Sequence, residues 1–110
     1  MQSNESLKQI KKGIVDLCVL SVLKKHDKLY TSDILIEIRK SGLLTSEGTI
    51  YPLLTRLKNK KLLTYEWVES NAGPPRKYYL LTHEGERYLD ELTESWKTIA
   101  ESVNYLIKKQ

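Results

Sequence analysis

The change of hydrophobic period along the chain limits the possible folds most strongly. Before residue 64 the apolar residues recur at helical spacing, whereas "TYEWVE" (64–69) and "RKYYLLT" (76–82) alternate with a period of two. These two runs flank "SNAGPP", which predicts an antiparallel hairpin with a short irregular loop. Three helices, one hairpin and a last helix describe a winged helix-turn-helix, a mainly α fold of the α+β class.

The first two helices are predicted from apolar spacing and from their ends. The first spans residues 5–25, with Leu7 among its apolar positions. The second begins at Thr31 or Ser32 and ends at Gly42, a residue type favoured just after a helix C-terminus.

The third helix contains an unfavourable residue. It follows the N-cap candidates Thr45 and Ser46, but Pro52 lies more than one turn inside it. Proline removes a backbone donor and crowds the preceding turn, although Gly48, four residues earlier, leaves room. The sequence therefore predicts a helix that is irregular near Pro52 or begins late.

From Thr82 a long final helix is predicted, with apolar residues at alternating steps of three and four. This heptad seam consists of Leu89, Leu92, Trp96, Ile99, Val103 and Leu106. A helix of roughly 25 residues is about 37 Å long, which is more than a small domain covers alone. We expect residues 1–83 to form the winged helix-turn-helix and residues 84–110 a dimerisation helix, together one compact unit.

Charge is unevenly distributed over the 110 residues, whose formal net charge is +4. Between residues 39 and 61 there are six basic residues and one acid, whereas most of the charged residues between 84 and 101 are acidic. Such segregation suits a protein that lays one face on a polyanion. The single cysteine, Cys18, and the lack of a long apolar run predict a cytoplasmic protein with no disulfide framework.

In a winged helix-turn-helix the third helix enters the DNA major groove and the hairpin flanks the duplex. The DNA-contacting candidates are Ser46, Thr49, Tyr51, Arg56 and Lys58 in the helix, and Arg76, Lys77 and Tyr78 in the hairpin. Two alternatives stay open. The hairpin loop could be a solvated turn with no DNA contact, and Tyr51 could pack within the protein instead of contacting DNA.

Two sequence motifs carry a family resemblance. "SEGTIYPLLTRLKNKKLL" followed by "GPPRKYYLLTHEG" resembles the recognition helix and wing of the PadR-like transcriptional regulators. The likeness spans about residues 17–96, and the single C-terminal helix is similar to the family's short-tailed subgroup. It implies a homodimeric repressor whose last helix packs on its symmetry mate and on the first helix, bound to a near-palindromic operator.

Trp96 resembles a tryptophan that stacks on planar ligands between the subunits of some short-tailed members. Leu17, Ser21 and Leu92 would then line a site for a small aromatic effector. The alternative is an ordinary aromatic anchor of a dimer interface. Trp67, on the first strand of the hairpin, is expected to cover the sheet.

The sequence offers no pattern typical of an enzyme, a metal site or a cofactor site. One cysteine and two distant histidines, His26 and His83, make no ligand set, and there is no glycine-rich phosphate loop. Two other classes remain as alternatives to a DNA-binding regulator. One is a winged-helix protein-interaction adaptor, and the other is a carrier of aromatic ligands that uses the Trp96 seam.

Overall fold

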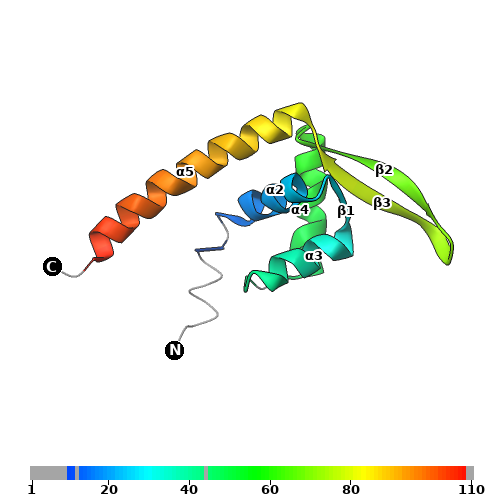
Figure 1. Ribbon diagram of the computed structural model, residues 1–110, viewed down its shortest axis with the longest axis horizontal. Helices are drawn as coiled ribbons and strands as arrows, with labels where there is room; N and C mark the ends of the chain where they lie inside the picture. Colours follow the sequence, from blue (N-terminus) through cyan, green and yellow to red (C-terminus); the bar gives the residue numbers. More distant parts are fainter. Residues whose placement is uncertain (1–9, 12, 44, 109–110) are drawn as a thin grey trace.

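The computed structural model describes residues 10–11, 13–43 and 45–108. Its elements are α2 (Val15–Lys25), β1 (Lys28–Tyr30), α3 (Thr31–Lys40), α4 (Glu47–Asn59), β2 (Leu63–Ser70), β3 (Gly73–Leu81) and α5 (His83–Ile107). The hairpin β2–β3 projects from one side of a small helical body, and α5 extends from it in the opposite direction (Figure 1). The described residues thus form the predicted winged helix with a long C-terminal helix.

The first two predicted helices differ in how well they match the structure. Residues 10–11 are helical, but Gly13 and Ile14 form a turn, so α2 begins only at Val15. The predicted start, residues 5–9 with Leu7, lies outside the described residues. α3 matches its prediction: it runs to Lys40, and Gly42 follows with a φ of 98°, a conformation that glycine adopts without strain.

α4 is one continuous helix despite Pro52. It starts at Glu47, directly after the extended N-cap Ser46, so it does not begin late. The proline ring points out to solvent, and the residue one turn earlier is Gly48, which carries no side chain to crowd it. The buried side of the helix consists of Ile50, Leu53, Leu54 and Leu57.

The sheet has three antiparallel strands in the order β1-β3-β2. β1 was not predicted, because three residues are too few to show a period; its Leu29 pairs with Tyr79. The hairpin loop is shorter than predicted: Pro74 and Pro75 belong to β3, and only Asn71 and Ala72 lie between the strands. Since prolines donate no ladder hydrogen bonds, the register shifts near this tip, between Val68 and Ser70.

One hydrophobic core joins α2, α3, α4 and α5 to the sheet. Its fully buried members include Leu20 and Leu23 of α2, Ile34 of α3, Leu54 of α4 and Leu63 of β2. Burial of each such side chain contributes roughly 1.5–3 kcal/mol. α5 reaches this core only through its first turns, which fixes where the helix starts but leaves its far end outside the body (Figure 1).

The junction between β3 and α5 is hydrogen-bonded to the connection between α4 and β2. Thr82 caps α5 by accepting a hydrogen bond from the Gly85 backbone N–H, and its own hydroxyl donates to the Lys61 carbonyl at 2.7 Å. Gly85 is buried here, and a Cβ on it would lie 2.0 Å from the Leu62 carbonyl oxygen. Only glycine therefore fits this corner.

Candidate nucleic-acid interface

The exposed side of α4 is the recognition surface that the fold predicts. Ser46, Thr49, Tyr51 and Lys58 are all exposed along it. The Ser46 and Thr49 hydroxyls face each other at 3.4 Å at the start of the helix, and the side chain of Ser46 makes no cap hydrogen bond to the backbone. Both residues are exposed, and contact of their hydroxyls with a phosphate or a base edge stays a prediction.

Cations from α4 and from the hairpin converge on one aromatic ring. The Lys58 Nζ lies 5.5 Å from the centre of the Tyr65 ring, and the Lys77 Nζ lies 4.1 Å from the same ring. Lys77 is also within 6 Å of the ring centres of Trp67 and Tyr79, a distance at which the ring quadrupole attracts a cation. The rings restrain both ammonium groups. Lys58 and Lys77 thus form a basic strip that runs from α4 onto the β2–β3 hairpin, which is the wing.

Arg76 and Lys77 lie on opposite faces of the wing, because successive strand residues alternate. Arg76 lies over the Tyr30 ring at 5.1 Å, and Tyr30 in turn packs against Tyr78 with ring centres 6.0 Å apart. Tyr78 is half-buried in this second face. The predicted wing residues therefore divide: Lys77 belongs to the face next to α4, and Arg76 and Tyr78 belong to the other.

Arg56 has a partner within the protein that the sequence did not indicate. Its Nη1 and Nη2 donate to the two carboxylate oxygens of Asp16 at 3.2 and 3.0 Å, a bidentate pair between α4 and α2. The hydrogen bonds and charge of Asp16 raise the pKa of Arg56 above its ordinary value. Arg56 and Lys58 point to different flanks of α4, because residues two positions apart in a helix are rotated by about 200° around its axis.

Three exposed residues of this surface were missed by the sequence reasoning. Thr55 and Asn59 lie on the side of α4 opposite its buried residues, and Trp67 is 63% exposed at the wing. The spacing of Gly48, Pro52, Thr55 and Asn59 (steps of four, three and four) would have indicated the outer stripe of the helix. The expectation that Trp67 covers the sheet is wrong: its ring is mostly exposed and contacts only the edge of Tyr65 and the Lys77 ammonium among the ring and cation contacts of the described residues.

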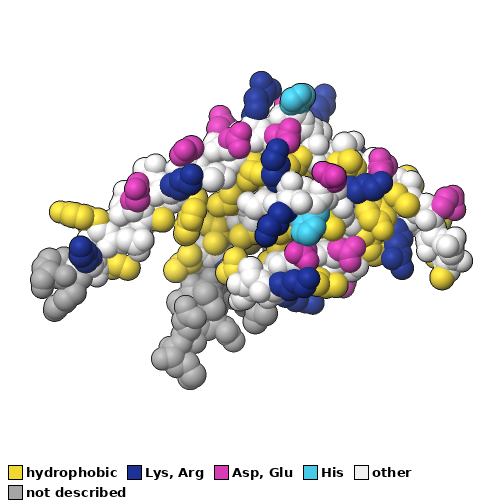
Figure 2. All heavy atoms as spheres, viewed as in Figure 1, with side chains coloured by type: hydrophobic (Ala, Val, Ile, Leu, Met, Phe, Trp, Pro, Cys, Tyr) yellow, Lys and Arg dark blue, Asp and Glu magenta, His cyan; other side chains and the backbone are white. Residues whose placement is uncertain are grey.

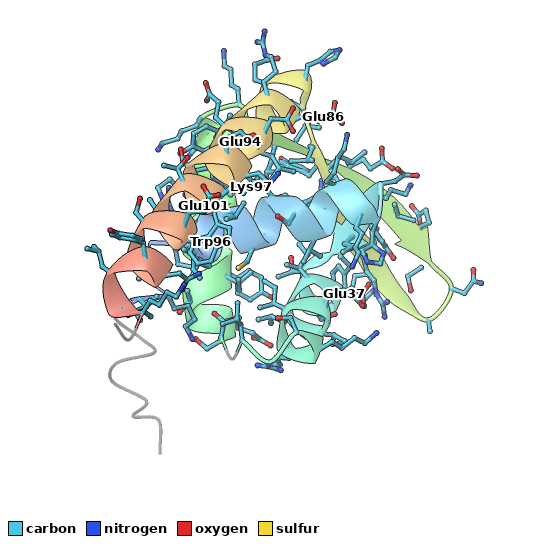
Figure 3. All side chains as sticks on the ribbon, turned by 60° about the vertical axis from the view of Figure 1, so that its left-hand side comes forward. Glu37, Glu86, Glu94, Trp96, Lys97 and Glu101 are labelled. Atoms are coloured by element: carbon cyan, nitrogen blue, oxygen red, sulfur yellow. The ribbon has the colours of Figure 1, made fainter. Side chains whose placement is uncertain are left out.

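The predicted effector residues lie where α2 passes α5. Leu92 and Leu17 pack partly against the core, whereas Ser21 is exposed. Trp96, one turn after Leu92, is 42% exposed (Figure 3). An open groove of about 630 Å³ lies along α5 and does not include Trp96. It is lined by Tyr88, Asp90, Glu91, Leu92, Glu94 and Ser95. Within one chain the predicted effector residues thus form an open surface.

The predicted dimer seam changes character along α5. Leu89 is 6% exposed and belongs to the chain's own core, so it is not open to a second chain. From Trp96 onward the seam is exposed, through Ile99 and Val103 to Leu106. Figure 2 shows hydrophobic side chains gathered on the concave side beneath α5, and again at its far end.

Cys18 is a half-buried free thiol in α2. Burial raises the pKa of the Cys18 thiol, which keeps it in its neutral form at neutral pH. Among residues 10–11, 13–43 and 45–108, no group of three or more His, Cys, Asp or Glu side chains is placed to hold a metal ion. In the same part of the chain, no helix is long and apolar enough to cross a membrane.

Known proteins share both the sequence pattern and the fold. A PadR-like transcription factor from Bacteroides fragilis is 50% identical, with a TM-score of 0.76 over 94% of this chain and 99% of that one. A PadR-like regulator from Bacillus cereus is 34% identical, with a TM-score of 0.83 over 93% and 99% of the two chains. A PadR family regulator from Eggerthella lenta is 29% identical, with a TM-score of 0.86 over 96% and 92%.

A family model also matches directly, over residues 19–91. This region contains the helix-turn-helix, the wing and the first turns of α5. The match confirms the resemblance of the recognition-helix and wing motifs. The chain belongs to the transcriptional regulator PadR-like family.

Proposed function

We propose that the protein is a homodimeric repressor that binds a near-palindromic DNA operator in the cytoplasm. The observation that carries this proposal is the strip formed by Lys58 and Lys77, which meet over the Tyr65 ring from the recognition helix and from the wing. A duplex that received α4 in its major groove would place phosphates against this strip. An adaptor that binds only proteins has no need for cations held in this way.

The exposed seam of α5 supports the dimer. Ile99, Val103 and Leu106 are large apolar side chains that are 54%, 44% and 73% exposed in the described chain. A second α5 packed along the same stripe would bury them and would give the protein two recognition helices related by a two-fold axis. Two such helices match the two half-sites of a palindrome.

The salt dependence of DNA binding tests the proposal. Fluorescence anisotropy with labelled duplex from the region upstream of the protein's own gene should give salt-sensitive, sequence-preferring binding. If the dimer neutralises roughly six to ten phosphates, the log–log salt slope is about −5 to −9. Binding that ignores salt and sequence would reject the proposal in favour of the adaptor.

Neighbouring residues of β3 provide a matched pair for the wing. Lys77→Gln should weaken binding and make the slope shallower by about 2 per dimer, because one phosphate contact is lost in each protomer. Arg76→Gln, on the other face of the wing, should change the DNA affinity and the salt slope less than Lys77→Gln does. Equal effects would mean that the duplex meets the edge of the wing instead of the face next to α4.

We also propose that a small planar aromatic effector binds beside Trp96 and releases the DNA. The support is that Trp96 combines partial exposure with a place on the seam, between the covered and the uncovered stretches of α5. In a Trp67→Phe background, Trp96 is the sole remaining tryptophan, so its fluorescence reports on this site alone. Quenching by a planar aromatic compound that also lowers DNA affinity is expected; quenching without an effect on DNA would favour a ligand carrier.

A further inference from the structure

The Arg56–Asp16 pair connects two elements that the proposed function uses separately. Arg56 belongs to the recognition helix α4, whereas Asp16 belongs to α2, forty residues earlier in the chain. The two donor–acceptor distances, 3.2 and 3.0 Å, lie within hydrogen-bond range, and the side chains of Asp16 and Arg56 are 26% and 48% exposed. The fork of the guanidinium therefore matches both carboxylate oxygens at once, a geometry that tolerates little rotation of either helix.

Apart from this pair and the Lys58–Tyr65 contact, the packing of α4 against the body is apolar. Its buried side chains Ile50, Leu54 and Leu57 lie in the common core, and the helix packs on α3 and β2. Apolar burial of this kind is non-directional, and it holds α4 against the body. The bidentate pair adds a directional restraint at the flank of α4 that faces α2.

α2 is in turn fixed to α5. The two helices pack together, and the Lys24 ammonium of α2 forms an ion pair with the Glu86 carboxylate of α5. A chain of contacts thus runs from α5, the proposed dimer helix, through α2 to Arg56 on α4. In a dimer, this chain would set the angle at which each recognition helix is presented to its half-site.

We propose that Arg56 is a positioning residue and not a DNA contact: its bidentate pair with Asp16 holds α4 at the angle required for operator binding. This inference rests on the proposed DNA-binding function. It reverses the sequence-based assignment of Arg56 to the major groove, while it leaves Lys58, on the other flank of α4, as a DNA contact. The Arg56 guanidinium affects operator binding only by fixing the orientation of α4.

The salt slope of DNA binding separates a positioning residue from a phosphate contact. Asp16→Asn, Arg56→Gln and the double variant are titrated with the same labelled upstream duplex at several salt concentrations. Both single variants should weaken binding by roughly tenfold with an unchanged slope. The double variant should be no weaker than either, because all three lose the same interaction.

Two results would overturn the inference. If Arg56 contacts phosphate, Arg56→Gln makes the slope shallower by about 2 per dimer, and Asp16→Asn leaves binding unchanged or tightens it by releasing the guanidinium. If neither single variant alters binding, the pair has no role in it. Arg56→Lys adds a check: it keeps the charge but loses the fork, so a positioning role predicts weakened binding and a phosphate contact predicts little change.

A readout without DNA keeps this test separate from the proposed function. Hydrogen exchange of the α4 backbone amides should become faster in Asp16→Asn and in Arg56→Gln, but not in Lys58→Gln, the matched variant on the opposite flank. Absence of any wild-type DNA binding would reject the proposed function alone. Unchanged exchange in both pair variants would reject the positioning role, whether or not DNA binds.

Discussion

The two halves of α5 carry the same heptad seam but differ in what covers it. In the first half, Leu89 is almost completely buried by the chain's own core, whereas in the second half Leu106 is 73% exposed. A heptad pattern therefore predicts that a stripe will be covered, but it does not say whether the same chain or another chain covers it. Four predictions, from the largest expected effect to the smallest, test this difference.

The start of α5 should tolerate change least. Gly85→Ala places a Cβ 2.0 Å from the backbone oxygen of Leu62, so α5 or the connection between α4 and β2 must move. We expect a loss of about 4 kcal/mol in the free energy of unfolding, measured by urea denaturation. Gly73→Ala is the control, since its Cβ would meet no atom within 4 Å. Equal stability of the two variants would contradict the corner geometry.

Leucines from the two halves should respond differently to protein concentration. Leu89→Ala should lower the free energy of unfolding by about 3 kcal/mol at every concentration, because it opens a cavity inside one chain. Leu106→Ala should lower it only at concentrations where the dimer forms, because association then contributes to the measured stability. A concentration-dependent effect of Leu89→Ala would place that residue in the dimer interface after all.

A charge in the exposed half should dissociate the dimer without unfolding the protomer. Ile99→Asp would bury a carboxylate between two α5 helices, and we expect the dimer dissociation constant to rise roughly 30-fold, or about 2 kcal/mol. Sedimentation equilibrium measures this constant. Thr98→Asp introduces the same charge one residue outside the seam and should leave it unchanged. An equal response to both substitutions would show that the seam is not the interface.

The Lys24–Glu86 ion pair joins α2 to the first half of α5, and its loss should change the stability of the protein least. The hydrogen bond and charge of Lys24 lower the pKa of the Glu86 carboxyl, so the pair stabilises the folded state above the usual carboxyl range. This contribution is lost as the pH falls through the lowered pKa. Glu86→Gln should therefore reduce Tm slightly at pH 7 and not at all once the pH lies below the lowered pKa of Glu86.

Glu94→Gln, an exposed carboxylate farther along α5 (Figure 3), is the control for the loss of negative charge. It should change Tm less than Glu86→Gln at pH 7. A deficit of Glu86→Gln that persists in acid would mean that the side chain stabilises the protein by packing and not by its charge.

The sequence by itself determined the family and the order of the elements other than β1. Helical spacing, the two alternating runs and the heptad seam are local patterns, and each element that showed one is present. The recognition-helix and wing motifs identified the PadR-like family before any contact was known, because their residues are contiguous in the chain.

Only the tertiary structure decided which side chains meet. The three residues of β1 form a strand because β3 offers its edge, and the bidentate partner of Arg56 lies forty residues away in α2. Lys77 and Arg76 are adjacent in the sequence yet lie against different rings on opposite faces of the wing. Such pairings depend on how distant segments pack, and no local pattern encodes them. The covered and uncovered halves of α5 likewise differ because the core ends partway along the helix.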